Sequence, residues 1–150
     1  MPMDYGKFTE KAQEMLVISQ GIIARYQNSQ LDTDHLLLAM LEQPDGTVPK
    51  LLQEVGIDTI RLADAVKKSI ERMPKVSGGG GGRQAQIYPT PAAQRVLSEL
   101  CWKIAERMQD QYVATEHILL AIIEEGASAG AKVLRDFPKS PVRASRLVAP

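Results

Sequence analysis

The sequence is poor in cysteine and in aromatic residues, with one cysteine, one tryptophan and two phenylalanines among 150 residues. The only cysteine, Cys101, excludes an internal disulfide and fits a reducing compartment. Aromatic residues and alternating β-branched residues, which favour strands, are scarce. We therefore expect a core of leucine, isoleucine, valine, alanine and methionine, and a fold with little β-structure.

The sequence also lacks an excess of charge and a long apolar run. Basic and acidic residues both number 18, so no net charge attracts nucleic acid or an anionic membrane. No apolar stretch approaches the roughly 20 residues of a membrane-spanning helix. The first five residues have no basic segment followed by an apolar run, as a signal peptide would. We expect a cytoplasmic protein that binds neither nucleic acid nor a membrane.

One segment of seven residues occurs twice. Residues 33–39 read TDHLLLA and residues 115–121 read TEHILLA, a shift of 82. The pairs Glu42/Glu124, Lys50/Lys132 and Leu52/Leu134 share this shift, whereas Thr9/Thr90, Ala12/Ala93, Gln13/Gln94, Leu16/Leu97, Ile23/Ile104 and Ala24/Ala105 are 81 apart. The second copy is therefore longer by one residue, in its first helix or in the loop after it. Self-similarity of this kind predicts one helical unit used twice.

Caps and apolar spacing predict the helices of each copy. In the first copy we expect helices from Thr9 to about Asn28, from a cap at Thr33 to Leu41, over Val48–Val55, and from a cap at Asp58 to Met73. In the second copy we expect helices from Thr90, from a cap at Thr115 to about Glu125, and over Ala129–Asp136. The predicted fold is all-α, with a first repeat at about 4–73, a linker at 74–89 that contains five consecutive glycines, and a second repeat at about 90–137.

The second copy lacks a counterpart of the fourth helix. Residues 137–141 read FPKSP, where the first copy reads VGID and continues into a long helix. The atypical tail, residues 138–150, could support at most two helical turns. If the two copies pack alike, either the tail covers the second copy or some of its apolar surface stays exposed.

The residues that commonly carry catalysis do not form a catalytic pattern. His35 and His117 have no cysteine or carboxylate at metal-ligand spacing, so we interpret both as structural imidazoles at a loop–helix junction. Cys101 lies in an apolar helical stretch, where a thiol acts as a small hydrophobe. The glycine run lacks the Lys-Ser/Thr ending of a phosphate-binding loop. We predict no metal, no cofactor and no hydrolysis of nucleotides.

Acidic residues near helix starts are the remaining candidates. Asp34 and Glu116 follow the threonines of the repeated motif, and Asp110 lies just upstream of the second one. In one interpretation they only stabilise helix dipoles, by about 0.3–1 kcal/mol each. In the other they rim two matching sites that bind cationic or amide groups of an extended or unfolded polypeptide. The residues alone leave both interpretations open.

The doubled motif, with Thr-x-x-Ala before each copy and Lys-x-Leu after it, resembles the Clp N-terminal domain over about Asp4 to Asp136. This module stands at the front of Clp-type AAA+ unfoldases and disaggregases such as ClpB and ClpC, and the sequence is similar to both. The resemblance implies one α-helical globule of two repeats related by a pseudo-twofold axis, with about four helices each. As an isolated domain it is expected to be monomeric.

The resemblance also implies a function and a set of site residues. The domain is expected to dock unfolded or aggregated proteins and adaptor proteins and to pass them to an AAA+ ring. The positions that bind peptide in ClpB-type domains match Thr9, Asp110 and Glu116. The positions that bind phosphorylated arginine in ClpC-type domains match Asp34 and Glu116, with Thr9 and Thr90 at the neighbouring caps. Carboxylates suit guanidinium groups, and free N–H groups at a helix start suit a phosphoryl group.

Two departures from the family pattern leave an alternative open. The sequence contains no ATPase motif, so we expect no enzymatic activity from this chain, and its tail is unlike the family. A second hypothesis is therefore a stand-alone accessory protein that regulates a Clp protease or unfoldase. A third, an enzyme that uses Cys101 or the two histidines, is disfavoured by the helical setting of these residues.

Overall fold

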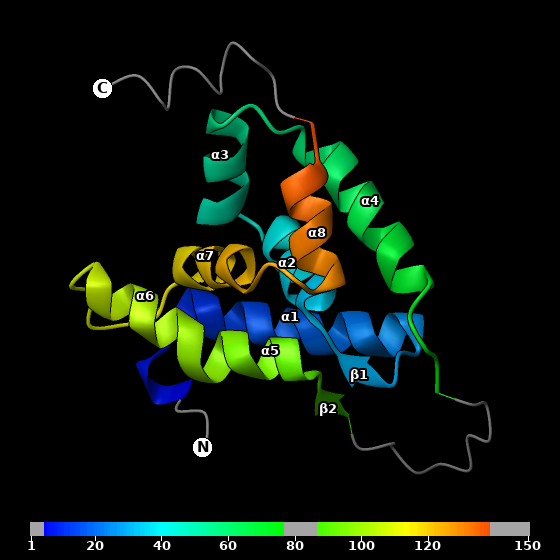
Figure 1. The fold of residues 1–150 in the computed structure, drawn as a ribbon, viewed down its shortest axis with the longest axis horizontal. Coiled ribbons are helices and arrows are strands. Elements are labelled where there is room, and N and C mark those ends of the chain that lie inside the picture. Colours follow the sequence, from blue (N-terminus) through cyan, green and yellow to red (C-terminus); the bar gives the residue numbers. More distant parts are fainter. Residues whose placement is uncertain (1–4, 77–86, 139–150) are drawn as a thin grey trace.

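A computed structural model describes residues 5–76 and 87–138 (Figure 1). The glycine run and the tail from residue 139 lie outside the described residues, and the predicted limits of the repeats remain a prediction. The first repeat contains a short 3-10 turn, η1 (Tyr5–Lys7), and helices α1 (Glu10–Tyr26), α2 (Thr33–Glu42), α3 (Thr47–Glu54) and α4 (Thr59–Glu71). The second contains a helix made of α5 (Pro91–Arg95), η2 (Val96–Leu100) and α6 (Cys101–Arg107), then α7 (Thr115–Glu125) and α8 (Ala129–Asp136).

The predicted helical fold is confirmed, and most of the predicted helix caps are too. The hydroxyl groups of Thr9 and Thr90 accept hydrogen bonds from backbone N–H groups three residues later, each over 3.1 Å. Asp58 caps α4 in the same way. The predicted caps at Thr33 and Thr115 are wrong, because both threonines are the first residues of their helices and the caps are the preceding residues.

The extra residue of the second repeat lies inside its first helix. The segment η2 is a π-helical turn, which holds one more residue per turn than an α-helix without ending it. Before this turn, the caps Thr9 and Thr90 are 81 residues apart. After it, the shift is 82. At the end of α1 the N–H of Asn28 donates to a carbonyl five residues earlier, and at the end of α6 the N–H of Asp110, 82 residues later in the chain, does the same.

This turn corrects two of the pairs expected from the sequence. Ile23 accepts the bond from Asn28, and Ala105 accepts the bond from Asp110. Ile23 therefore corresponds to Ala105, not to Ile104, and Ala24 corresponds to Glu106. Identical residues 81 positions apart are therefore still found beyond the π-helical turn, although the residues that are structurally equivalent there are 82 apart.

Two short parallel pairings join the repeats and were not predicted. The two-residue strands β1 (Gln30–Leu31) and β2 (Tyr88–Pro89) pair in parallel, with Leu31 opposite Pro89. A parallel bridge between Phe8 and Val113 is the counterpart of that pair. Each pairing therefore connects the segment before the first helix of one repeat to the segment before the second helix of the other.

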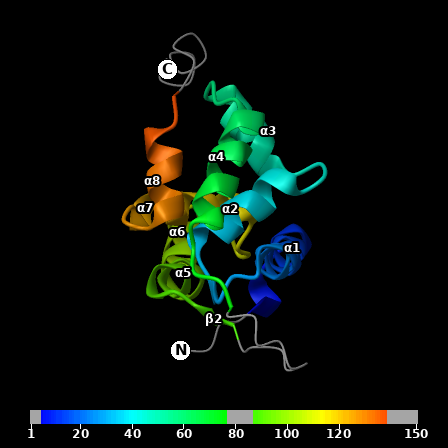
Figure 2. The same cartoon turned by 90° about the vertical axis from the view of Figure 1, so that its right-hand side faces the viewer.

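The core lies between the two repeats, with α2 and α7 at its centre. Viewed nearly end-on in Figure 2, α1 and α5 lie on either side beneath α2. The largest fully buried side chains come from both repeats: Phe8, Met15, Ile22, Ile23, Leu36, Leu37, Leu38, Met40, Leu62, Ile70, Leu97 and Ile118. Cys101 is buried among them, and burial raises the pKa of its thiol to about 12. Among the described helices, none is long and apolar enough to cross a bilayer.

Candidate functional site

Two equivalent junctions hold the starts of α2 and α7. The backbone N–H of Thr9 donates to the carbonyl of Val113 over 2.9 Å, and the N–H of Thr90 donates to the carbonyl of Leu31 over 2.8 Å. The first-helix cap of each repeat is thus bonded to the loop before the second helix of the other repeat. We call the junction at Thr9 and residues 110–117 the α7 junction, and the junction at Thr90 and residues 28–35 the α2 junction.

The two histidines occupy matching positions in these junctions. His35 Nδ1 accepts the N–H of Asp32 over 2.9 Å, and His117 Nδ1 accepts the N–H of Ala114 over 2.8 Å. Each Nε2 therefore carries the proton and donates over 2.8 Å, to the side chain of Asn28 or of Asp110. The prediction of structural imidazoles is confirmed. Burial lowers the pKa of His35 to about 4, so this ring stays neutral near neutral pH.

The α2 junction closes over its acidic residue. Asp34 is fully buried between α2, α4 and α8, and its Oδ2 accepts a hydrogen bond from the hydroxyl of Ser69. Its Oδ1 is buried without a well-formed hydrogen bond among the described residues. Burial raises the pKa of this carboxyl from 3.8 to about 6, although the hydrogen bond from Ser69 opposes the rise. Asp34 has no exposed surface in this fold, so a binding role for it would require the α2 junction to open, and this role stays a prediction.

Thr90 also belongs to the α2 junction, and its hydroxyl group is already engaged in hydrogen bonds within the chain. Its hydroxyl donates to Asp32 Oδ1 over 2.9 Å and accepts the N–H of Ala93. The sequence-based set is therefore divided, with Asp34 and Thr90 at one junction and Thr9, Asp110 and Glu116 at the other. Only the second group presents carboxylates to solvent.

The α7 junction is open. The side chain of Asp110 is 48% exposed and bonded to His117, and Glu116 is half-buried on the first turn of α7. Thr9 lies against the same loop through its bond to Val113. The structure thus brings together the three residues that were expected from ClpB-type domains.

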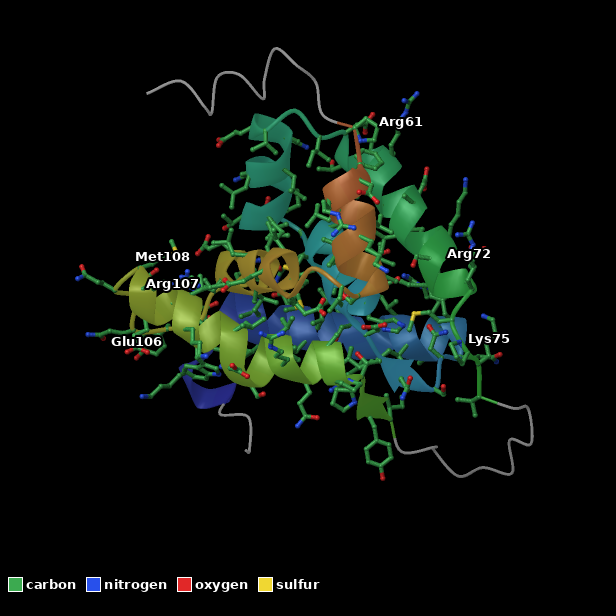
Figure 3. The ribbon with its side chains drawn as sticks, viewed as in Figure 1. Arg61, Arg72, Lys75, Glu106, Arg107 and Met108 are labelled. Carbon is green, nitrogen blue, oxygen red and sulfur yellow. The ribbon has the colours of Figure 1, made fainter. Side chains whose placement is uncertain are left out.

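Beside the α7 junction lies an apolar groove of about 610 Å³. Residues of α3, α7 and α8 line it, together with Ile57 and with Met108 at the end of α6. Figure 1 shows how these helices are arranged, and Met108 is labelled in Figure 3. The lining residues are Leu51, Leu52, Glu54, Val55, Ile57, Met108, Glu116, Leu119, Leu120, Ile123, Leu134 and Arg135. Glu116 therefore belongs both to the junction and to the wall of the groove.

Within residues 5–76 and 87–138, α7 lacks the cover that α2 has, and this leaves the groove open. In the first repeat α4 packs on α2 and α8, and Leu38 is fully buried. Its counterpart Leu120 is 41% exposed, and Ile123, the counterpart of half-buried Leu41, is 50% exposed. Among the described residues no helix follows α8, and apolar surface of the second repeat is exposed. The alternative, that the tail covers this surface, concerns residues outside the described ranges.

Sequence reasoning missed the side chains that form this groove. Leu51, Met108, Leu120 and Ile123 all read as ordinary helix residues, and all are at least 37% exposed. The signal that could have found them was the missing fourth helix, because aligning the copies shows which side chains that helix would have covered.

Comparison with known proteins supports the repeat assignment. Residues 7–137 match the family described as the Clp repeat (R) N-terminal domain. The chain is 38% identical over 136 residues to the chaperone protein ClpB 1 of Nostoc sp.. It is 33% identical over 135 residues to the negative regulator of genetic competence ClpC/MecB of Bacillus subtilis. These matches cover 91% and 90% of this chain but only 15% and 16% of the relatives, so the chain spans about one sixth of their length and contains no ATPase domain.

Solved structures show the same fold. The N-terminal domain of Hsp104 from Candida albicans superposes with a TM-score of 0.75 at 23% identity, covering 95% of this chain and 92% of that domain. The N-terminal domain of the ClpV1 ATPase from E. coli gives a TM-score of 0.71 at 16% identity, covering 95% of this chain and 83% of the other. With the matched family, the paired junctions and the doubled motif in agreement, the chain belongs to the Clp repeat N-terminal domain family.

Proposed function

We propose that this chain is a non-catalytic docking domain that binds segments of other proteins in the apolar groove and at the α7 junction. In a longer Clp-type protein it would hand these segments to an AAA+ ring. The observation that carries the proposal is the exposure of Leu120 and Ile123 in a groove whose wall includes the carboxylate of Glu116. Apolar surface concentrated in a concave site marks a binding surface.

The chemistry of the site suits polypeptide ligands. The groove offers leucine, isoleucine and methionine side chains to apolar residues, and flexible methionine adapts to ligands of different shape. Glu116 and Asp110 add acceptors for backbone N–H groups, lysine or arginine. Unfolded proteins, aggregated proteins and adaptors that expose such segments are the proposed partners. Arginine-phosphorylated proteins are a further class, with Glu116 binding the guanidinium part.

An NMR titration of the chain with a permanently unfolded protein tests this function. We expect resonances of residues 108–123 to shift and Glu116→Ala to weaken binding by about fivefold, as for loss of one partly exposed ion pair. Asp64→Ala is the matched control, because Asp64 is an exposed acid on α4, outside the lining of the groove. Equal affinities for the wild type and Glu116→Ala would refute the assigned site.

A parallel titration with phosphoarginine tests the tagged-protein class. Shifts centred on Glu116 and Thr9 are expected. Shifts confined to the α2 junction would contradict the assignment, because Asp34 is buried there.

A further inference from the structure

The groove occupies the place that the pseudo-twofold axis assigns to a second copy of α4. In the first repeat α4 packs on α2 and α8, and its counterpart would pack on α7 and α3. Those two helices supply most of the residues that line the groove. The first repeat therefore shows, inside the same molecule, what kind of element covers this surface.

That element is an amphipathic helix with a regular set of contacts. The inner face of α4 carries three fully buried side chains spaced four residues apart, Leu62, Val66 and Ile70. Ser69, seven residues after Leu62, donates its hydrogen bond to Asp34. The opposite face is exposed and carries charges of both signs, among them Asp64 and Lys68, and Arg61 and Arg72 project into solvent (Figure 3).

The groove differs from the surface under α4 in its charge. Glu116 replaces Asp34, and Glu54 of α3 also lines the groove. Neither forms an ion pair within the described part of the chain, whereas Arg135 is paired with Asp136. A helix seated in the groove would therefore meet two uncompensated carboxylates, and a lysine or arginine suits the position that Ser69 holds in α4.

The tail of this chain is a poor match for the groove. At the shift of 82, Lys139 takes the place of Ile57, which is buried before the start of α4. Ala144 takes the place of Leu62. Two of the apolar side chains that anchor the first-repeat segment thus have a charged and a small residue at the matching positions of the tail, although Val66 is matched by Val148. The tail therefore does not reproduce the contacts of α4, and the charge of the groove favours a basic partner helix.

We infer that the groove binds an amphipathic helix of a partner protein in the orientation of α4. The helix carries apolar side chains at positions i, i+4 and i+8, which cover Leu120 and Ile123, and a lysine or arginine at i+7, which meets Glu116. This inference rests on the docking function proposed above and specifies its ligand as a basic amphipathic helix rather than an extended chain.

The α4 segment itself is a suitable probe. A labelled peptide of residues 57–74 should bind the full chain, and its helical circular dichroism should rise on binding because so short a helix is marginal alone. The Leu120→Ala/Ile123→Ala variant should bind about tenfold more weakly, since both side chains lose buried area. Ile60→Ala is the matched control, because Ile60 is 76% exposed on α4, outside the groove. A peptide with aspartate at positions 62 and 66 should not bind.

A charge cycle tests the orientation. The Ser69→Lys peptide should bind several-fold more tightly than the unmodified peptide, as for one partly exposed ion pair. This gain should disappear with the Glu116→Gln chain and persist with the Asp64→Asn chain. A gain that survives Glu116→Gln would overturn the proposed orientation. Both chain variants replace accessible side chains, and circular dichroism verifies that they are folded.

The remaining outcomes identify other occupants. If removal of residues 139–150 raises peptide affinity tenfold or more, the tail fills the groove and the inference falls. A dimer in sedimentation that Leu120→Ala/Ile123→Ala abolishes would assign the groove to a second copy and would also overturn it. The chain could also bind an unfolded protein but not the α4 peptide, with an affinity that Ile123→Ala reduces. This result would refute the helical ligand and leave the docking function intact. Failure of both ligands would refute both proposals.

Discussion

Replacement of Asp34 by asparagine gives a direct test of the closed α2 junction. Asparagine has nearly the same shape, keeps an acceptor for the hydroxyl of Ser69 and cannot ionise. The wild-type carboxyl is fully buried, and its Oδ1 lacks a well-formed hydrogen bond among the described residues. Ionisation at this place is therefore unfavourable, which is why burial raises its pKa to about 6.

The magnitude follows from the difference between the folded and unfolded pKa values. As pH rises through 3.8, Asp34 ionises in the unfolded chain, whereas the folded chain keeps its proton until about pH 6. The folded state binds more protons in this interval, so this residue lowers the free energy of unfolding as pH rises. At about 1.4 kcal/mol per pH unit, the loss between pH 3.8 and about 6 is about 3 kcal/mol. The Asp34→Asn variant cannot ionise at this position, so its free energy of unfolding does not decrease for this reason.

Denaturant unfolding of the wild type and Asp34→Asn across this pH range measures the effect. The free energy of unfolding of the variant minus that of the wild type should rise by about 3 kcal/mol from about pH 4 to about pH 7. Asp64→Asn, on exposed α4 surface, is the control and should show no such rise. A difference that stays constant with pH would show that the carboxyl is solvated and that the junction is open.

The neighbouring His35 contributes the opposite dependence. Burial lowers its pKa from 6.5 to about 4, so the folded state binds fewer protons than the unfolded state between these values. Its contribution to the free energy of unfolding therefore rises with pH over nearly the interval in which that of Asp34 falls. The wild type should consequently vary less with pH than Asp34→Asn.

Four further predictions address packing and burial. Gly130→Ala should reduce the free energy of unfolding by about 1–3 kcal/mol, because an added Cβ would lie 2.7 Å from Thr33 Oγ1 and 2.8 Å from the N atom of Asp34. Gly21→Ala, with nothing within 4 Å, should raise it by about 0.5–1 kcal/mol, and denaturant unfolding checks both. Deletion of Ser98 should lower the melting temperature less than deletion of its α1 counterpart Val17, because removal of one residue from the π-helical turn restores a regular α-helix. An equal loss for both deletions would contradict the assignment of the extra residue to this turn. Cys101 in the native chain should react with a thiol reagent no faster than global unfolding allows, and rapid labelling would show that α6 opens locally.

The sequence was informative about the fold because duplication leaves a pattern that local rules can use. Thr9, Thr90 and Asp58 are caps that depend only on neighbours a few residues away. The structural role of the histidines was also predictable, because each stands at a helix start. The cap at Asp32 was missed, since the threonine after it is an equally good cap by composition.

The candidate site was less predictable because it depends on contacts between the repeats. Asp34 and Glu116 hold equivalent places in the sequence, but α4 packs over Asp34, and no helix of the described part of the chain packs in the same way over Glu116. The pairing of β1 with β2 involves two residues on each side, too few to leave a periodic pattern. Packing thus assigns different roles to residues that local sequence treats as the same.

The reciprocal bonds from Thr9 to Val113 and from Thr90 to Leu31 have a consequence for the ancestry and folding of this domain. Each half completes the start of a central helix in the other half, so neither half alone would satisfy its own backbone there. A single unit of this kind would need a second copy of itself before it could fold. Fusion of two units into one chain makes that encounter intramolecular, and we expect the halves to fold and unfold together rather than in sequence.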